Sequence, residues 1–439
     1  MKKTFYLLIA LIMNASVYCQ TANDYYNSGV DKHARKNFEG AIADFTKSIE
    51  LNPTSIYSYN GRGFAKRRLG DYIGAIIDFT KSIELNPNYV KTYCNRGNVK
   101  IDLQEFEAAI ADFNTAMQID PKYAEAYNSR GNLKRKLNDI LGALDDYSKA
   151  IDLDSKFANA FFNRGVTKVR LKDYEGAIAD YTKTIKIDPT YYEAYYNRGN
   201  IHIQLKDYKQ AISDFDKAIK INPKLIQAYD DRAYSKMALK DYPAAIQDFL
   251  EVIKHQPNNS KTYINLAYSR QGLGDTKAAI ADYSKAIEIK PIDTLAYFYR
   301  GNAFYSLQDY KGAIDDYTKI IEIDSLNLNA HLNRGRANIG LKYFTAAIVD
   351  LSKAIEINPR YENAYYHRGF ANKQLEDYSN AIYDYSKAIE INPKNADAYL
   401  ERSFAKFESG QKDSGCKDLA KAKELGNTRA IESYMIHCK

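Results

Sequence analysis

The chain has 439 residues, 45% of them hydrophobic, and a formal net charge of +7. So mild a charge on so long a chain argues against nucleic acid as the partner, because nucleic-acid-binding domains usually carry a strong basic stripe. The length alone would suggest about three domains of roughly 150 residues. An internal period overrides that estimate.

The first twenty residues have the pattern of a secretory signal peptide. A basic start with two lysines is followed by an apolar run over residues 5–13. That run is too short to anchor the chain across a bilayer. Lipidation at Cys19 is a less favoured alternative, because bulky Tyr18 stands where lipoprotein signals carry a small residue. We therefore expect residues 1–20 to be removed from a secreted or periplasmic protein with no transmembrane anchor.

The rest of the chain repeats itself every 34 residues without a gap. Twelve units cover residues 22–429 and start at 22, 56, 90, 124, 158, 192, 226, 260, 294, 328, 362 and 396. A fixed period of this kind predicts a solenoid, which grows by stacking and has no single core. In each unit two helical patterns are separated by a turn.

Recurring residues mark the helices of the unit. An aromatic residue begins the first helix in eleven units, and a glycine follows four residues later in nine. Glycine inside a helix costs roughly 1 kcal/mol relative to alanine, so we expect another helix backbone to approach closely there. Eight turns carry an aspartate suited to the N-cap of the second helix. They are Asp71, Asp139, Asp173, Asp207, Asp241, Asp275, Asp309 and Asp377.

The unit resembles the tetratricopeptide repeat (TPR). In residues 192–225 the resemblance rests on Tyr195, Arg198, Gly199, Ala211, Phe215 and Pro223. It implies an all-α fold, an α-solenoid wound as a right-handed superhelix of about twelve helix–turn–helix units. The first helices of such a superhelix line a concave groove that binds a protein or peptide.

Ten units depart from the family by carrying an arginine where it usually has a leucine, just before the small residue. A buried arginine needs a partner, and an aspartate in the second helix is present in all twelve units. We expect a ladder of ion pairs formed by Arg62, Arg96, Arg130, Arg164, Arg198, Asp78, Asp112, Asp146, Asp180 and Asp214. Pairing within a unit would leave Asp44 and Asp282 alone, whereas pairing with the next unit would leave Asp248 and Asp418 alone. The sequence does not choose between them.

Two further stretches differ from the regular unit. Residues 226–290 are atypical, which indicates either a flexible joint or sequence drift. The last unit resembles the ending of Sel1-like repeats, and residues 430–439 predict a capping helix. Cys416 and Cys438 are either a disulfide, which an oxidising compartment permits, or two small buried residues.

No motif for catalysis, metal binding or a cofactor is present in the sequence, so we expect a protein that is not an enzyme. The informative positions are those facing the groove, where the repeats stop agreeing. By resemblance to the family they give a basic set and an aromatic set. The basic set, with its amides, is Arg67, Arg68, Asn98, Asn132, Arg135, Lys136, Arg170 and Asn200, and the aromatic set is Tyr196, Phe298, Tyr305, Tyr366, Phe370 and Phe404.

These positions predict a groove that is basic toward the N-terminal half and aromatic toward the C-terminal half. An extended acidic or amphipathic polypeptide would suit it. A competing interpretation is that the basic residues complement helix dipoles and the aromatic residues pack against neighbouring units. The leading hypothesis is a non-catalytic extracytoplasmic scaffold that binds protein or peptide. The alternatives are a self-associating component of an envelope or secretion assembly, and a glycan-binding protein.

Overall fold

The computed structural model describes residues 20–438, and within that range every regular element is a helix. The chain divides into two compact units, residues 1–205 and 206–439. The predicted fold class, an all-α solenoid of paired helices, is confirmed. The predicted signal peptide falls almost wholly outside the described residues and stays a prediction. None of the described helices is both long and apolar enough to cross a membrane.

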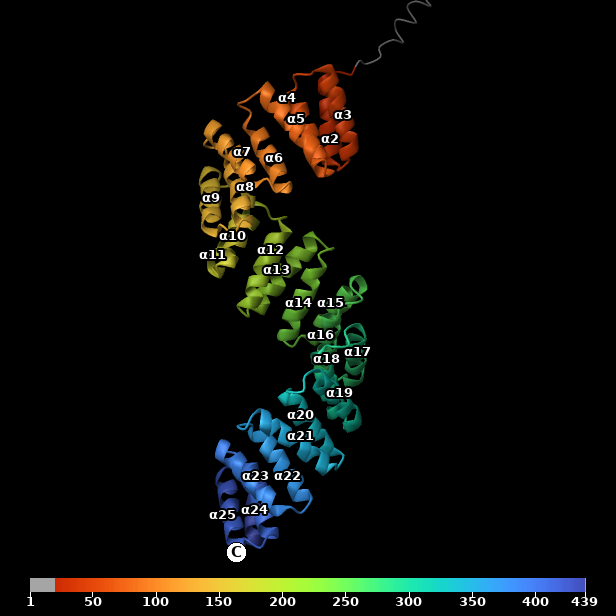
Figure 1. Ribbon diagram of the computed structural model, residues 1–439, viewed down its shortest axis with the longest axis vertical. Helices are drawn as coiled ribbons and strands as arrows, with labels where there is room; N and C mark the ends of the chain where they lie inside the picture. The colour runs from red at the N-terminus through yellow and green to blue at the C-terminus, as the bar shows by residue number, and fades with distance from the viewer. Residues whose placement is uncertain (1–19, 439) are drawn as a thin grey trace, which may run out of the picture. The chain divides into compact units, whose positions relative to one another are not determined.

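Paired helices follow one another along both units (Figure 1). The first unit contains α2 (Ala22–Ala34), α3 (Phe38–Leu51), α4 (Ile56–Arg68), α5 (Tyr72–Leu85), α6 (Val90–Asp102), α7 (Phe106–Ile119), α8 (Ala124–Lys136), α9 (Ile140–Leu153), α10 (Ala158–Arg170), α11 (Tyr174–Ile187) and α12 (Tyr192–Gln204). The second unit contains α13 (Tyr208–Ile221), α14 (Ile226–Ala238), α15 (Tyr242–His255), α16 (Ser260–Gly272), α17 (Thr276–Ile289), α18 (Thr294–Ser306), α19 (Tyr310–Ile323), α20 (Leu328–Gly340), α21 (Phe344–Ile357), α22 (Glu362–Gln374), α23 (Tyr378–Ile391), α24 (Ala396–Glu408), α25 (Lys412–Glu424) and α26 (Thr428–His437).

The turn inside a repeat combines a left-handed residue with a helix cap. Lys172 has a φ of 60°, and Asp173 after it caps α11 by accepting a hydrogen bond from the backbone N–H of Gly176. All eight aspartates predicted to be N-caps cap their helices in this way. The left-handed residue is not visible in the repeat pattern, because lysine, glutamine, asparagine and glutamate occupy it as well as glycine.

A ring fills the space beside the repeated glycine of the first helix. A Cβ built on Gly165 would lie 2.9 Å from Cε1 of Tyr181, and one built on Gly63 would lie equally close to the ring of Phe79. Both rings are fully buried, so they could not move aside cheaply. The prediction that another helix backbone approaches this glycine is therefore wrong at these two positions, where the close neighbour is a second-helix aromatic side chain. At Gly335 the nearest side chain is Leu351, and the backbone oxygen of Ala347 does come within 3.4 Å of a built Cβ.

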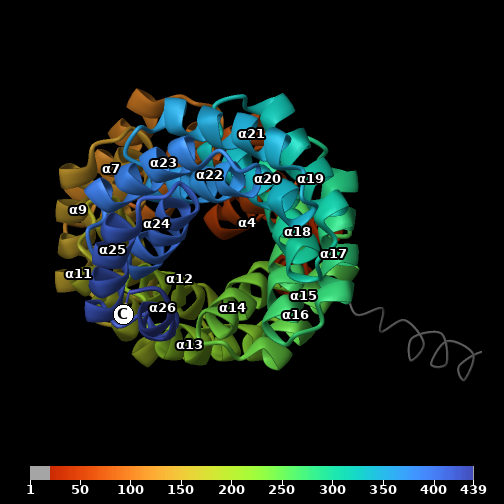
Figure 2. The same cartoon turned by 90° about the horizontal axis from the view of Figure 1, so that it is seen from below.

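The helices of each compact unit form two layers. The first helix of a repeat packs against the second helix, which packs in turn against the next first helix. Within residues 206–438, α18, α20 and α22 lie on the inner side of the curve, and α17, α19 and α21 on the outer side (Figure 2). We call the surface formed by the first helices the first-helix face. Helices α14 to α17 pack consecutively, so the chain does not divide within the atypical stretch 226–290.

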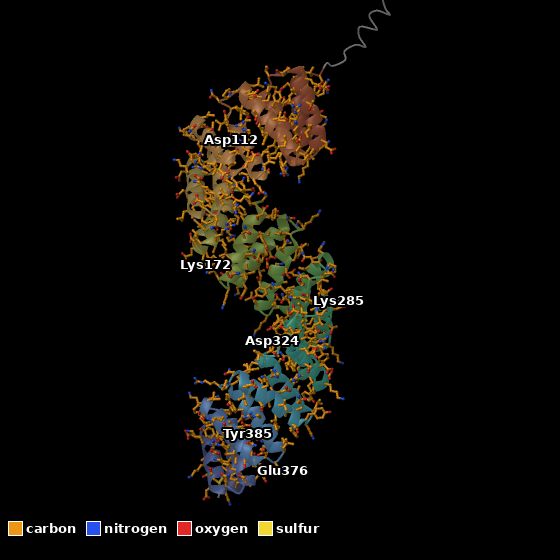
Figure 3. The ribbon with its side chains drawn as sticks, viewed as in Figure 1. Asp112, Lys172, Lys285, Asp324, Glu376 and Tyr385 are labelled. Atoms are coloured by element: carbon orange, nitrogen blue, oxygen red, sulfur yellow. A yellow bond between two sulfur atoms is a disulfide. The ribbon has the colours of Figure 1, made fainter. Side chains whose placement is uncertain are left out.

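The arginine of each described ladder pair binds the aspartate of its own repeat. Arg164 donates from Nε and Nη2 to the two carboxylate oxygens of Asp180, at 3.0 and 2.8 Å. The same pairing joins Arg62 to Asp78, Arg96 to Asp112 (labelled in Figure 3), Arg130 to Asp146, Arg232 to Asp248, Arg300 to Asp316, Arg334 to Asp350, Arg368 to Asp384 and Arg402 to Asp418. Arg198 and Asp214 belong to different compact units, and their pairing stays a prediction.

Two further contacts, which the sequence analysis did not foresee, complete the ladder. Lys168 lies 2.8 Å from Asp180 and adds a second cation to that carboxylate. Arg164 also donates from Nη1 to Ser148 Oγ of the preceding repeat, at 3.1 Å. One arginine therefore holds two successive repeats together.

The two aspartates that within-repeat pairing would leave alone have partners of their own. Asp44 accepts a hydrogen bond from Ser28 and lies 2.6 Å from Lys32. Asp282 lies 2.7 Å from Arg270. That expectation of isolation is wrong, because the residue four after the ladder position also reaches the carboxylate.

Helix α26 covers the end of the second compact unit. Its Ala430 is buried in a cluster with Leu400, Leu419 and Ala422. Cys416 and Cys438 form a disulfide that ties the end of this helix to α25. The structure therefore favours the bonded alternative over two buried thiols. The Sel1-like ending stays a prediction.

Candidate functional site on the first-helix face

A hollow of about 260 Å³ opens on the first-helix face near the start of the chain. Its lining includes Tyr26 of α2, Tyr57 of α4 and Tyr89, which precedes α6; successive ring centroids are 6.3 and 5.6 Å apart. Gly61 also lines the hollow, and every other repeat carries a larger residue at this sixth position. The ring of Phe45 lies against Gly61, since a Cβ built there would be 2.6 Å from its Cζ. The predicted basic surface therefore begins with a hollow that is largely aromatic, although Lys91 also lines it.

His33 borders the same hollow as a neutral group. Its Nε2 is buried without a hydrogen-bond partner among residues 20–438, and the rings of Phe38 and Phe64 lie edge-on at 5.2 and 5.1 Å. Burial, and then the charge of Arg68, lowers the pKa of His33 below its ordinary value. The imidazole therefore adds a polar edge without adding charge at neutral pH.

Three of the predicted basic residues are engaged by their neighbours. Arg67 forms an ion pair with Asp102 of α6 at 2.7 Å. The guanidinium of Arg68 lies 5.5 Å from the ring centroid of Phe38, and Lys136 packs over another ring in the same way, 5.1 Å from the centroid. The pair at Arg67 removes one free charge from the face.

The basic character of the face is concentrated in α8 and α10. Arg135 donates to the hydroxyl of Tyr147 at 3.3 Å, and that hydroxyl donates to Asn132 at 2.8 Å. Arg170 donates to the backbone carbonyl of Arg135 at 3.3 Å. In the described part of the chain, neither arginine has a carboxylate within 4.0 Å. These two residues form the part of the face that matches the predicted basic surface.

A second hollow, of about 440 Å³, is lined by amide and apolar side chains. Asn197, Asn200 and Gln204 of α12 supply the amides, while Val166 and Tyr181 are among the other lining residues. Tyr196 of α12 is half-buried, and so is Asn98, which lies on α6, away from this hollow. Such a hollow offers hydrogen bonds to a peptide backbone above an apolar surface.

The predicted aromatic set of the second compact unit packs against its neighbours. Phe298, Tyr305, Tyr366, Phe370 and Phe404 are all half-buried. The ring of Tyr366, for example, lies 5.8 Å from that of Tyr385. Lys373 lies over Phe370 and Phe404 and is paired with Glu401. Packing, the competing interpretation, accounts for much of this set, and the surface around it is charged as well as aromatic.

A third hollow, of about 370 Å³, lies among residues that the sequence analysis did not single out. Tyr234, Tyr268 and Tyr299 of α14, α16 and α18 line it, and the first two are about 40% exposed. Tyrosine occupies the ninth repeat position only at Tyr234 and Tyr268, and comparison of that position along the sequence would have found them. In residues 20–438 no group of three His, Cys, Asp or Glu residues is arranged to hold a metal ion.

Comparison with solved structures finds other repeat proteins with similar helices. MamA shares 27% identity and covers 39% of this chain and 94% of its own, with a TM-score of 0.37. A TPR protein from Parabacteroides merdae shares 22% identity over 56% of this chain and 98% of its own, with a TM-score of 0.39. The Cut9–Hcn1 assembly of the APC/C matches 99% of both chains at 13% identity, with a TM-score of 0.43. No curated protein sequence matches the chain.

Family models match segments in both compact units. The tetratricopeptide repeat models match residues 56–89, 192–225, 294–325 and 362–395, and the TPR repeat model matches residues 97–138, 131–172, 167–206, 272–308 and 343–376. Together these segments span more than half of the chain. The chain belongs to the tetratricopeptide repeat family.

Proposed function

We propose that the protein is a non-catalytic extracytoplasmic scaffold that binds a protein or peptide partner along its first-helix face. The observation that carries the proposal is the placement of the hollows. Each draws its lining largely from successive first helices, so an extended segment crossing those helices would contact several repeats. Tyrosine and arginine, which supply much of this surface, are enriched in protein interfaces.

The acidic residues support a scaffold over an enzyme. The recurring aspartates whose pairs are described above are held in structural ion pairs, as Asp180 is by Arg164 and Lys168. Such carboxylates are committed to holding repeats together. The location outside the cytoplasm rests on the signal-peptide pattern of residues 1–20.

Site-directed photocrosslinking tests the proposal with a matched pair of positions in one repeat. Benzoylphenylalanine would replace either Tyr57 on the first-helix face or Ile77 on the second helix, which are 54% and 62% exposed. We expect a partner to be captured from cells at Tyr57 and not at Ile77. Capture only at Ile77 would contradict the proposal that the partner binds along the first-helix face. Light scattering that shows growth with concentration would favour the self-associating alternative, and fractionation to the cytoplasm would overturn the location.

A further inference from the structure

Arg336 on α20 is the one charged residue at the ninth position of any repeat. The other repeats place an aliphatic, aromatic or amide side chain there. They are Val30, Phe64, Asn98, Asn132, Val166, Asn200, Tyr234, Tyr268, Asn302, Phe370 and Phe404. The period therefore gives no structural reason for a charge on this part of the first-helix face.

The guanidinium of Arg336 is held in place without a counter-ion. Its Cζ lies 5.1 Å from the ring centroid of Tyr305 on α18, and its Nη1 donates to Asn333 at 3.3 Å. Its Nε is buried and has no hydrogen-bond partner within residues 20–438. A buried donor left unpaired costs about 1–3 kcal/mol, and more when it is charged. By contrast, the ladder arginine two residues earlier, Arg334, is bidentate on Asp350.

The surroundings do not neutralise this charge. Helix α22 contributes His367, whose pKa is lowered to about 4 by burial and then by Arg336, so it is neutral at pH 7. Asp350 forms an ion pair with Arg334, and Glu401 of α24 forms one with Lys373. No carboxylate of the described chain lies within 4.0 Å of Arg336. Helices α18, α20 and α22 lie next to one another on the inner side of the curve (Figure 2).

We propose that Arg336 binds an oxyanion of the peptide partner, a carboxylate or phosphate group that supplies the counter-ion which the guanidinium lacks in the described chain. The inference rests on the proposed use of the first-helix face and adds the chemistry of the partner. A planar guanidinium presents paired N–H groups that fit the oxygens of a carboxylate or phosphate. Lys373 is already paired, so this part of the face takes one oxyanion. The ring of Tyr305 beside the guanidinium favours an apolar residue next to the oxyanion.

Nuclear magnetic resonance with small blocked probes tests this on the full mature chain. The probes are the N-acetyl amide of glutamate, N-acetyl-leucine with a free carboxylate, and inorganic phosphate, with the N-acetyl amide of glutamine as the neutral comparison. The first three distinguish a side-chain carboxylate, a chain terminus and a phosphate as sources. The signals followed are the Nε–H of Arg336 and the titration of His367, at an ionic strength held constant with chloride.

We expect a saturable shift of the Arg336 signal with at least one oxyanion probe, and a rise in the pKa of His367 as the neighbouring charge is neutralised. Arg336→Gln should weaken that binding about ten-fold or more, as expected for the loss of a charge-assisted hydrogen bond. Arg336→Lys should retain part of it. Arg360→Gln, which removes an exposed arginine from the loop between α21 and α22, should leave it unchanged.

Equal responses to the glutamate and glutamine probes would overturn the inference, as would a response that survives in Arg336→Gln. A wild-type chain that responds to no oxyanion probe would overturn it as well. These outcomes are independent of the crosslinking at Tyr57. The anion test can therefore fail while crosslinking supports peptide binding along the first-helix face. Conversely, crosslinking can fail while Arg336 still binds an anion.

Discussion

Two repeats of the same length hold the same aspartate in different ways. In residues 158–191, Arg164 and Lys168 both contact Asp180. In residues 260–293 the ladder position is Leu266, which is fully buried, and only Arg270 contacts Asp282. The ladder arginine is therefore one of three ways to fill this position, since the first repeat has Ser28 there, and the fold accepts an apolar residue as well.

The replacement extends to the neighbouring repeat. Sixteen residues before each ladder arginine of the second compact unit there is a polar acceptor, as Ser284 is for Arg300. Sixteen residues before Leu266 the chain has Leu250. Both ends of one polar contact have become apolar together, which removes the need to satisfy a buried donor. The atypical stretch is thus a coherent local alternative.

The largest expected effect comes from removing the aspartate of the regular repeat. Asp180→Ala leaves two half-buried cations without their counter-ion, and we expect a loss of about 3 kcal/mol in the free energy of unfolding. Urea denaturation followed by far-UV circular dichroism measures it. The exposed Asp145→Ala serves as the control and should change stability little. A loss below about 1 kcal/mol for Asp180→Ala would mean that solvent screens the ladder.

The two repeats should differ in their response to pH. Burial raises the pKa of Asp282 from 3.8 to about 6. The folded state then binds this proton more tightly than the unfolded state, so its contribution to stability is greatest below about pH 4 and falls as the pH rises to about 6. Asp282→Asn removes the titrating carboxyl group, and with it the loss of stability as the pH rises. The variant should therefore gain on the wild type by roughly 2 kcal/mol between these pH values.

Unfolding of both chains in urea across this pH range measures the difference. A stability difference between the two chains that does not change with pH would show that Arg270 fully offsets the effect of burial on the carboxylate. The carbon signal of the Asp282 side chain gives the same pKa directly, and provides a check that does not depend on unfolding.

Restoring the arginine tests whether Leu250 and Leu266 act as a pair. Leu266→Arg alone gives Asp282 a second cation but leaves one guanidinium N–H facing an apolar residue, so we expect a loss of about 1–2 kcal/mol. Adding Leu250→Ser supplies the acceptor and should recover about 1 kcal/mol of it. Thermal and urea unfolding of both single variants and the double variant give the coupling energy. Strict additivity would mean that the two leucines are unrelated.

The sequence predicts local features well and contacts between helices less well. The caps, such as Asp173, follow from residues within one turn of a helix. The ladder register does not, because both pairings satisfy the period, and only the packing of α10 on α11 brings Arg164 to Asp180. The contact between the Tyr181 ring and Gly165 could not be predicted from the sequence for the same reason. The hollows depend on which side chains are small and which are large across several helices, as at Gly61.

The smallest expected effect lies in the turns of the same two repeats. Lys172 and Gly274 occupy equivalent positions and both have positive φ, 60° and 85°. A side chain is disfavoured in that region, whereas glycine adopts it freely but loses more chain entropy on folding. The backbone strain of a side chain at positive φ outweighs the entropy that glycine loses. Lys172→Gly should therefore stabilise the chain by about 0.5–1 kcal/mol, and Gly274→Lys should destabilise it by a similar amount. Unequal magnitudes in thermal unfolding would show that Lys172 gains from a contact beyond its backbone, because a Cβ on Gly274 meets open space.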